Sequence, residues 1–220
     1  MAEWSEHVER EITRYRDGEA RLPEADESDP RQKQLTRMGN AAGGAGLALL
    51  MQGEQDQAAE WFHRAADRYR ESMEEAPPGS WGRPIGAMKS LVLAGDWAGA
   101  EDAARWALEL GSAETPSPIG RYAATLAHLI LGENDEARPL ASSLRESADF
   151  PQDVADSLAT LAASDRLGYV YAVESVLESF ATREEYLEDI PVADTVLVLQ
   201  ALAERRDVAA DLSSPLLPKN

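Results

Sequence analysis

Three stretches of this 220-residue chain repeat one pattern: GLALLMQGEQDQAAEWFHRAA at residues 46–66, AMKSLVLAGDWAGAEDAARWA at 87–107 and ATLAHLILGENDEARPLASSL at 124–144. In each stretch an apolar segment ends at a glycine, an acidic residue follows at once, and an alanine stands five positions after the glycine. The glycines are Gly53, Gly95 and Gly132, and the alanines are Ala58, Ala100 and Ala137. Glycine is typical of helix ends, and a small residue is needed where two helices cross closely. The pattern therefore predicts three helix pairs.

The rest of the chain has the same helical character. Apolar residues recur every three or four positions, as at Trp4, Val8, Ile12 and Tyr15, and no long alternation of apolar and polar residues indicates a strand. Helix starts are marked by Asp29-Pro30 and Ser117-Pro118. We predict an all-α fold of about ten helices, with an acidic linker at 17–28. The helices lie near 3–16, 30–52, 55–75, 82–94, 97–110, 118–131, 134–147, 151–163, 167–181 and 193–204.

The three repeated stretches resemble the tetratricopeptide repeat (TPR), in which small residues stand where two helices cross. The first unit carries the resemblance best, through Gly46, Ala58, Phe62 and Ala65. The glycines that end the units are 42 and 37 residues apart, which is longer than the period of about 34 in a regular repeat. The resemblance implies a degenerate TPR-like array of antiparallel helix pairs, a right-handed α-solenoid.

The resemblance also gives an expected domain organisation, a single helical domain over residues 1–220. An N-terminal capping helix and the acidic linker occupy 1–28, TPR-like pairs 29–147, further helical pairs 148–204 and a C-terminal tail 205–220. The last helix contains VADTVLVLQALA (192–203), which is apolar nearly all round and must be buried on several sides. Either the preceding helices cover it, or it forms a homodimer with a second copy.

The net charge of the chain excludes some classes of binding partner. Forty acidic residues against 21 basic ones give a net charge of −19, and the three lysines are Lys33, Lys89 and Lys219. Such a chain repels phosphate, so we expect neither nucleic acid nor a membrane as a partner. The acidic, lysine-poor composition resembles that of proteins from extreme halophiles. The polar N-terminus MAEWSEHVER does not fit a signal peptide, and we expect a cytoplasmic protein.

Motifs for catalysis and metal binding are weak. The chain has no cysteine, and His7, His63 and His128 are too far apart in sequence to form a zinc-binding pair. The glycine-rich stretch 39–46 lacks the lysine and hydroxyl ending of a phosphate-binding loop, so a closely packed helix explains it better. We therefore predict no catalytic residue, no metal site and no cofactor.

Partner binding is the remaining class of function. In TPR-type domains the first helix of each pair lines a concave groove, and the resemblance places there Asn40, Arg83, Lys89, Arg121 and Tyr122. Lys89 would hold an acidic group of the partner, with Asn40 and Tyr122 adding polar contacts. The alternative is that the chain's own following helices fill this groove.

Three functions follow from these observations. The leading one is a non-enzymatic scaffold that binds a protein or peptide on the concave face. The second is a small-ligand or catalytic pocket in the same concavity. The third is a toxin-neutralising immunity protein, because residues 163–191 and the tail 214–218 (SPLLP) resemble helical-repeat immunity proteins of polymorphic toxin systems.

Overall fold

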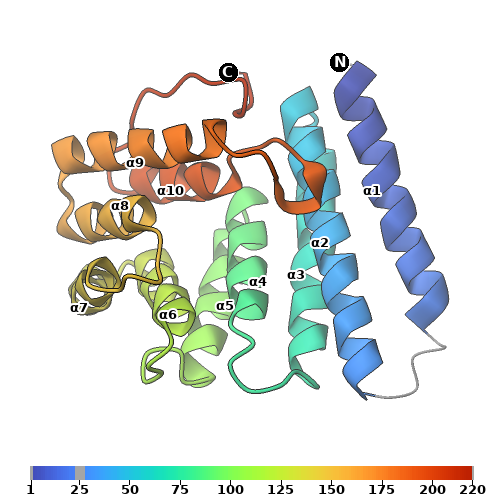
Figure 1. Cartoon of the computed structure of the whole chain (residues 1–220), viewed down its shortest axis with the longest axis horizontal. Helices are drawn as coiled ribbons and strands as arrows, with labels where there is room; N and C mark the ends of the chain where they lie inside the picture. Colours follow the sequence, from blue (N-terminus) through green and yellow to red (C-terminus); the bar gives the residue numbers. More distant parts are fainter. Residues whose placement is uncertain (1, 23–27, 220) are drawn as a thin grey trace. The chain divides into compact units, whose positions relative to one another are not determined.

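The computed structural model describes residues 2–22 and 28–219, and all the regular structure within these ranges is helical (Figure 1). The all-α fold and the expected number of helices are confirmed. The described residues form ten α-helices and a short 3-10 helix, η2 (Leu187–Asp189). The α-helices are α1 (Ala2–Arg21), α2 (Ser28–Gln52), α3 (Gln55–Met73), α4 (Gly82–Leu93), α5 (Trp97–Glu109), α6 (Pro118–Leu131), α7 (Asn134–Arg145), α8 (Gln152–Ala163), α9 (Arg166–Ala181) and α10 (Asp194–Glu204).

The predicted helix bounds agree with these to within two residues, except at the end of α1. This helix continues to Arg21, so the first part of the expected linker is helical, and residues 23–27 lie outside the described residues. Gly18 explains the difference. A Cβ atom at Gly18 would lie 2.6 Å from Cγ of Met38, so the glycine lets α1 approach α2 closely instead of ending the helix.

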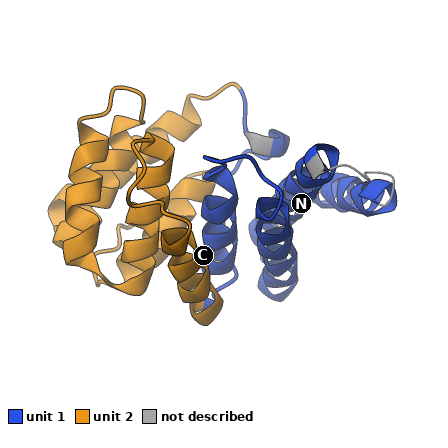
Figure 2. Cartoon of the chain, turned by 90° about the horizontal axis from the view of Figure 1, so that it is seen from below, with its two compact units in different colours: residues 1–96, 185–192, 217–220 blue, residues 97–184, 193–216 orange. Residues whose placement is uncertain are grey.

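The chain forms two compact units (Figure 2). Unit 1 comprises residues 1–96, 185–192 and 217–220, and unit 2 comprises 97–184 and 193–216. Within unit 1, α1 packs on α2, α2 on α3 and α3 on α4. Within unit 2, the helices from α5 to α9 also pack on their neighbours in sequence, and α10 packs on α8 and α9. Sequential packing of this kind is compatible with a helical repeat.

The three glycines of the repeated pattern close their helices in the same way. Gly53, Gly95 and Gly132 have φ angles of +82°, +72° and +76°, in the left-handed region that glycine adopts without a steric penalty. The backbone N–H of the acidic residue that follows each glycine donates to a carbonyl five residues back, at 2.9 or 3.0 Å. These bonds are Glu54 to Leu49, Asp96 to Leu91 and Glu133 to His128. This is the Schellman cap, and it ends α2, α4 and α6.

The same cap occurs twice more without a glycine. Ser164 (φ 54°) ends α8, and Asp165 N–H donates to the carbonyl of Thr160 at 2.9 Å. Asp207 (φ 56°) follows α10, and the N–H of the next residue, Val208, donates to the carbonyl of Ala203 at 3.1 Å. The cap therefore closes every second helix from α2 to α10, and the repeat continues past residue 147, where the sequence pattern faded.

Small side chains stand where the repeat requires them. Ala58, Ala100 and Ala137 are 0 % exposed, as are Ala65 and Ala107. In unit 1, Ala58 of α3 packs in a cluster with Leu49 of α2 and Phe62. The alignment of the three sequence stretches thus coincides with equivalent buried positions.

The glycine-rich part of α2 is a packing surface, as expected. A Cβ atom at Gly39 would lie 2.9 Å from the Tyr69 ring, and one at Gly46 would lie 2.7 Å from the Phe62 ring. At Gly44 the nearest atom would be Cγ of Glu11, at 3.2 Å. The glycines therefore let α1 and α3 approach the backbone of α2.

The apolar last helix is covered within unit 2. Its residues Val196, Val198, Leu199 and Leu202 are buried, and Ala193 N–H donates to the carbonyl of Leu216 at 3.0 Å. The chain itself therefore buries these apolar side chains, and the homodimer stays a prediction. Among the described helices, none combines the length and apolarity needed to cross a membrane.

Candidate functional site

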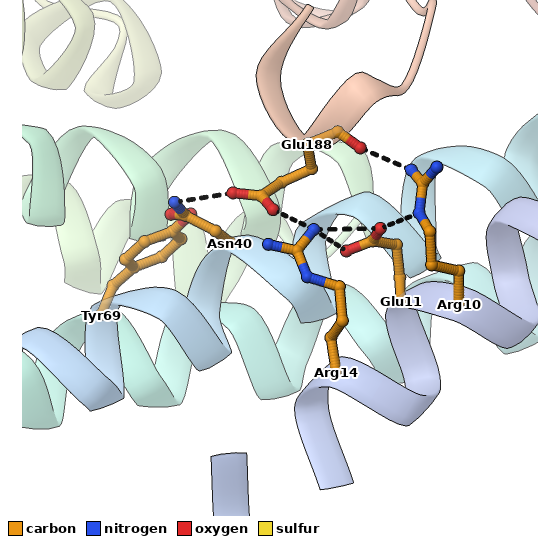
Figure 3. Close-up of polar contacts among 6 residues, drawn as sticks. All are labelled: Arg10, Glu11, Arg14, Asn40, Tyr69 and Glu188. Carbon is orange, nitrogen blue, oxygen red and sulfur yellow. Dashed lines mark hydrogen bonds and ion pairs between the residues drawn. The ribbon is translucent and has the colours of Figure 1, made fainter. Parts of the chain in front are cut away.

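A cluster of six polar residues in unit 1 joins segments that are far apart in the sequence (Figure 3). Helix α1 contributes three of them, α2 and α3 contribute one each, and the last comes from the segment 185–192. They are Arg10, Glu11, Arg14, Asn40, Tyr69 and Glu188.

Glu11 lies at the base of this cluster and is 0 % exposed. Its carboxylate accepts hydrogen bonds from Arg10 Nε at 2.7 Å and from Arg14 Nη1 at 3.0 Å. The two arginines are four residues apart on α1 and so lie on the same side of the helix. Gly44 of α2 leaves the room that the buried Glu11 side chain needs.

Glu188 joins the cluster from the loop 185–192, which contains η2. Its carboxylate forms an ion pair with Arg14 and accepts a hydrogen bond from Asn40 Nδ2 at 3.1 Å. Its backbone carbonyl accepts a second hydrogen bond, from Arg10 Nη2 at 2.6 Å. The Tyr69 hydroxyl donates to Asn40 Oδ1 at 2.9 Å, which turns the amide NH₂ group toward Glu188. One glutamate is therefore held through both its side chain and its backbone.

The charges of the cluster balance. Two arginines face two carboxylates, and each carboxylate contacts an arginine. Partial burial acts to lower the pKa of Arg14, but the Glu11 and Glu188 carboxylates outweigh burial and raise the pKa above its ordinary value. An arginine in such a position keeps its charge and offers a fixed binding group for a carboxylate.

The loop that carries Glu188 has a strained backbone. Glu188 and Asp189 have φ angles of 57° and 54°, and neither residue is a glycine. The left-handed conformation costs an L-residue roughly 1–2 kcal/mol. Contacts elsewhere must offset this cost. The hydrogen bonds to Glu188 and the burial of Ile190 and Val192 are the contacts that hold the loop.

The five residues expected in the groove are divided between the two units. Asn40, Arg83 and Lys89 lie in unit 1, whereas Arg121 and Tyr122 lie in α6 of unit 2. Asn40 hydrogen-bonds an acidic side chain as the groove hypothesis requires, but that side chain belongs to the same chain.

Arg83 and Lys89 are both partly buried in α4. Arg83 donates to the Ser72 hydroxyl at 2.7 Å and to the Gln32 side-chain oxygen, and burial lowers its pKa. In unit 2, the Tyr122 ring contacts Phe150 with the ring centres 5.4 Å apart. Arg83, Lys89, Arg121 and Tyr122 are each partly buried.

Five residues of the cluster were not predicted from the sequence: Arg10, Glu11, Arg14, Tyr69 and Glu188. Glu11 lies seven residues before Gly18 and four before Tyr15, and all three positions are buried on one face of α1. An acidic residue on a buried helix face, flanked by arginines, is a sequence signal that could have identified Glu11. The contribution of Glu188 could not be found in this way, because it stands 178 residues from Arg10.

The histidines do not gather into a metal site. His63 Nε2 lies 3.1 Å from Asp96 Oδ2, and His128 Nδ1 lies 2.8 Å from Glu133 Oε2. In both pairs the acid is the residue that follows a cap glycine. Over residues 2–22 and 28–219, no group of three histidine or acidic side chains is arranged to hold a metal ion.

Unit 1 also has an open groove on the other flank of α1. Its volume is about 450 Å³, and it lies between α1, the end of α2 and the start of α3. Val8, Ile12 and Leu49 provide its apolar lining, and Glu9 and Arg16 are among its polar residues.

Comparisons with protein-family models, with curated proteins and with solved structures found no match to this chain.

Proposed function

We propose that this protein is a non-enzymatic, cytoplasmic scaffold of TPR-like type that binds a peptide segment of a protein partner on the α2 face of unit 1. The observation that carries the proposal is the hydrogen bond from Asn40 to Glu188. These residues are 148 positions apart, and Glu188 lies in the short 3-10 segment η2, where its own backbone angles are non-helical, and contacts α1 and α2. A helix face that holds one such segment within the chain has the chemistry to hold another from a partner.

The recurring cap and the buried alanines support the TPR-like part of the proposal. In that family the first helix of each pair lines the binding surface, and α2 is the first helix of the first pair. Asn40 projects from α2, and Tyr69 of the second helix fixes the orientation of its amide. A side chain oriented in advance loses little entropy on binding, which favours recognition.

The chemistry of the cluster favours binding over catalysis. Its carboxylates are occupied by arginines, so neither is placed as a free general base. Arginine and amide donors that converge on a carboxylate are typical of peptide recognition. We therefore favour a scaffold function over a catalytic pocket at this site.

The test is a selection of random peptides, displayed on phage, against the immobilised full-length protein in molar KCl. Dissociation constants of the enriched peptides are then measured by calorimetry for the wild type, Asn40→Asp and Gln52→Glu. Asn40→Asp keeps the oxygen that Tyr69 contacts but removes the NH₂ donor and adds a negative charge. Gln52→Glu makes the same change at the end of α2, in the open groove.

We expect Asn40→Asp to weaken binding about tenfold or more, because a hydrogen bond to a charged group is lost and repulsion replaces it. Gln52→Glu should bind as the wild type does. Enrichment of no peptide would refute the scaffold function. Loss of binding in Gln52→Glu alone would move the site to the open groove.

A further inference from the structure

We propose that the partner segment presents a carboxylate to Arg14 and Asn40, and that residues 185–192 (EYLEDIPV) occupy this site in the free protein as a competing internal ligand. This inference rests on the proposed function and adds to it the class of the partner and a means of regulation. The loop then has a second role besides its place in the fold, because it keeps the site closed until a partner displaces it.

The contacts to Glu188 match a carboxylate together with its own backbone carbonyl. Arg14 and Asn40 together contact both carboxylate oxygens of Glu188, since Asn40 binds Oε1 and Arg14 binds Oε2. Arg10 binds the backbone carbonyl of the same residue. Donors so arranged recognise an acidic residue at the tip of a turn, with its carbonyl and its side chain on the same side (Figure 3).

The donors are oriented by contacts that do not involve the loop. Glu11 is buried and binds both arginines, and Tyr69 binds the oxygen of the Asn40 amide. None of these contacts uses the loop 185–192. The site is therefore preorganised, and another acidic segment finds the same donors in the same positions.

The segment 185–192 is held in a strained conformation. Glu188 and Asp189 both occupy the left-handed region, which opposes the hydrogen bonds that hold them. Ile190 and Val192 are 2 % exposed and anchor the end of the segment independently of Glu188. The tip can then leave the arginines while the apolar end stays in place.

Tethering sets the size of the expected effect. A tethered segment competes with an effective concentration in the millimolar range. If the loop binds its site with an intrinsic dissociation constant near one tenth of that value, it fills about nine tenths of the sites, and any competing free peptide should appear about tenfold weaker. Removal of the Glu188 carboxylate should recover most of this factor.

The experiment measures the binding of fluorescein-labelled EEYLEDIPVA, the sequence of residues 184–193, by fluorescence anisotropy. A second peptide has glutamine in place of the glutamate that corresponds to Glu188. The full-length proteins are the wild type, Glu188→Ala and Glu184→Ala. Glu184 is an exposed acid just before the segment, so its variant has the same change in charge.

We expect Glu188→Ala to bind the labelled peptide about tenfold more tightly than the wild type and Glu184→Ala do. The glutamine peptide should bind Glu188→Ala at least about tenfold more weakly, because the charged acceptor for Arg14 is lost. Introduction of Asn40→Asp into Glu188→Ala should weaken binding by a similar factor while circular dichroism shows unchanged helicity.

The outcomes separate the two proposals. Equal, saturable binding by the wild type and Glu188→Ala would overturn the internal competition and leave the scaffold function standing. If Glu188→Ala binds neither acidic peptide but binds peptides from the phage selection, the carboxylate specificity is wrong. If it binds neither the acidic peptides nor any selected peptide, the scaffold function fails as well.

Discussion

At the scale of single residues, the close approach of helices in unit 1 depends on the absence of side chains. Gly39 and Gly46 each receive an aromatic ring against the backbone of α2, whereas a Cβ atom at Gly43 would meet nothing within 4 Å. All three lie inside the same helix, where glycine lowers stability relative to alanine. The glycines of α2 therefore differ in what they contribute, and substitution by alanine separates them.

We expect Gly46→Ala to lower the free energy of unfolding by about 1–3 kcal/mol, because the new methyl group clashes with Phe62. Gly43→Ala should raise it by up to about 1 kcal/mol, since alanine is the better helix former and space is free. Chemical denaturation of both variants measures these changes. A Gly46→Ala protein as stable as the wild type would contradict the close packing of α2 and α3.

The cap at the end of α8 offers a second substitution. Ser164 adopts the left-handed conformation at a position where its counterparts are glycines. We expect Ser164→Gly to stabilise the protein by about 0.5–1 kcal/mol, because relief of strain exceeds the added flexibility of the unfolded chain. The matched control is Ser142→Gly at an exposed position inside α7, which should destabilise by about 0.5 kcal/mol. Destabilisation by both changes would show that Ser164 is not strained.

At the scale of helices, the repeat is a set of pairs that cross at small residues. Ala58 of α3 is fully buried beside Leu49 and Phe62, so the distance between α2 and α3 depends on its size. We expect Ala58→Leu to lower the free energy of unfolding by about 1–3 kcal/mol through overpacking. Ala20→Leu, at an exposed position of α1 in the same unit, should change it little. Equal stability of the two variants would show that the repeat alignment is wrong at Ala58.

The sequence allowed the helices to be predicted because their ends are local signals. Prolines at helix starts and glycines at helix ends mark positions that short-range backbone geometry determines. The end of α1 was predicted too early because residues 17–28 have the acidic composition of a linker, whereas Gly18 packs against Met38 inside the helix. The caps at Ser164 and Asp207 were missed for the opposite reason, since they have the geometry without the glycine.

Less of the candidate site could be predicted from the sequence. Asn40 was found because the repeat resemblance gives a position to each residue of α2. Arg10 and Arg14 act only through Glu11 and Glu188, and the last of these reaches them by a contact across most of the chain. Long-range pairs of this kind leave no periodic trace in a single sequence.

At the scale of the whole molecule, we expect the net negative charge to control how stability depends on salt. Forty acidic residues repel one another in dilute buffer, and at molar salt the screening length falls to about 3 Å. We expect the melting temperature, followed by circular dichroism, to rise strongly between low salt and molar KCl. Sucrose, which favours burial without screening charge, is the control and should produce a smaller rise. A melting temperature that does not respond to KCl would rule out the halophilic character of the chain.

The discontinuous course of unit 1 along the chain has a consequence for synthesis on the ribosome. Residues 1–96 carry Arg14 and Asn40, but the loop that occupies their site belongs to residues 185–192. At roughly 5–20 residues per second, the loop is made about 5–20 s after residue 96. During that interval the proposed site has Arg14 and Asn40 but not the Glu188 carboxylate that contacts them in the full chain. A partner present near the ribosome would then bind without competition, and the complex would form more readily during translation than after it.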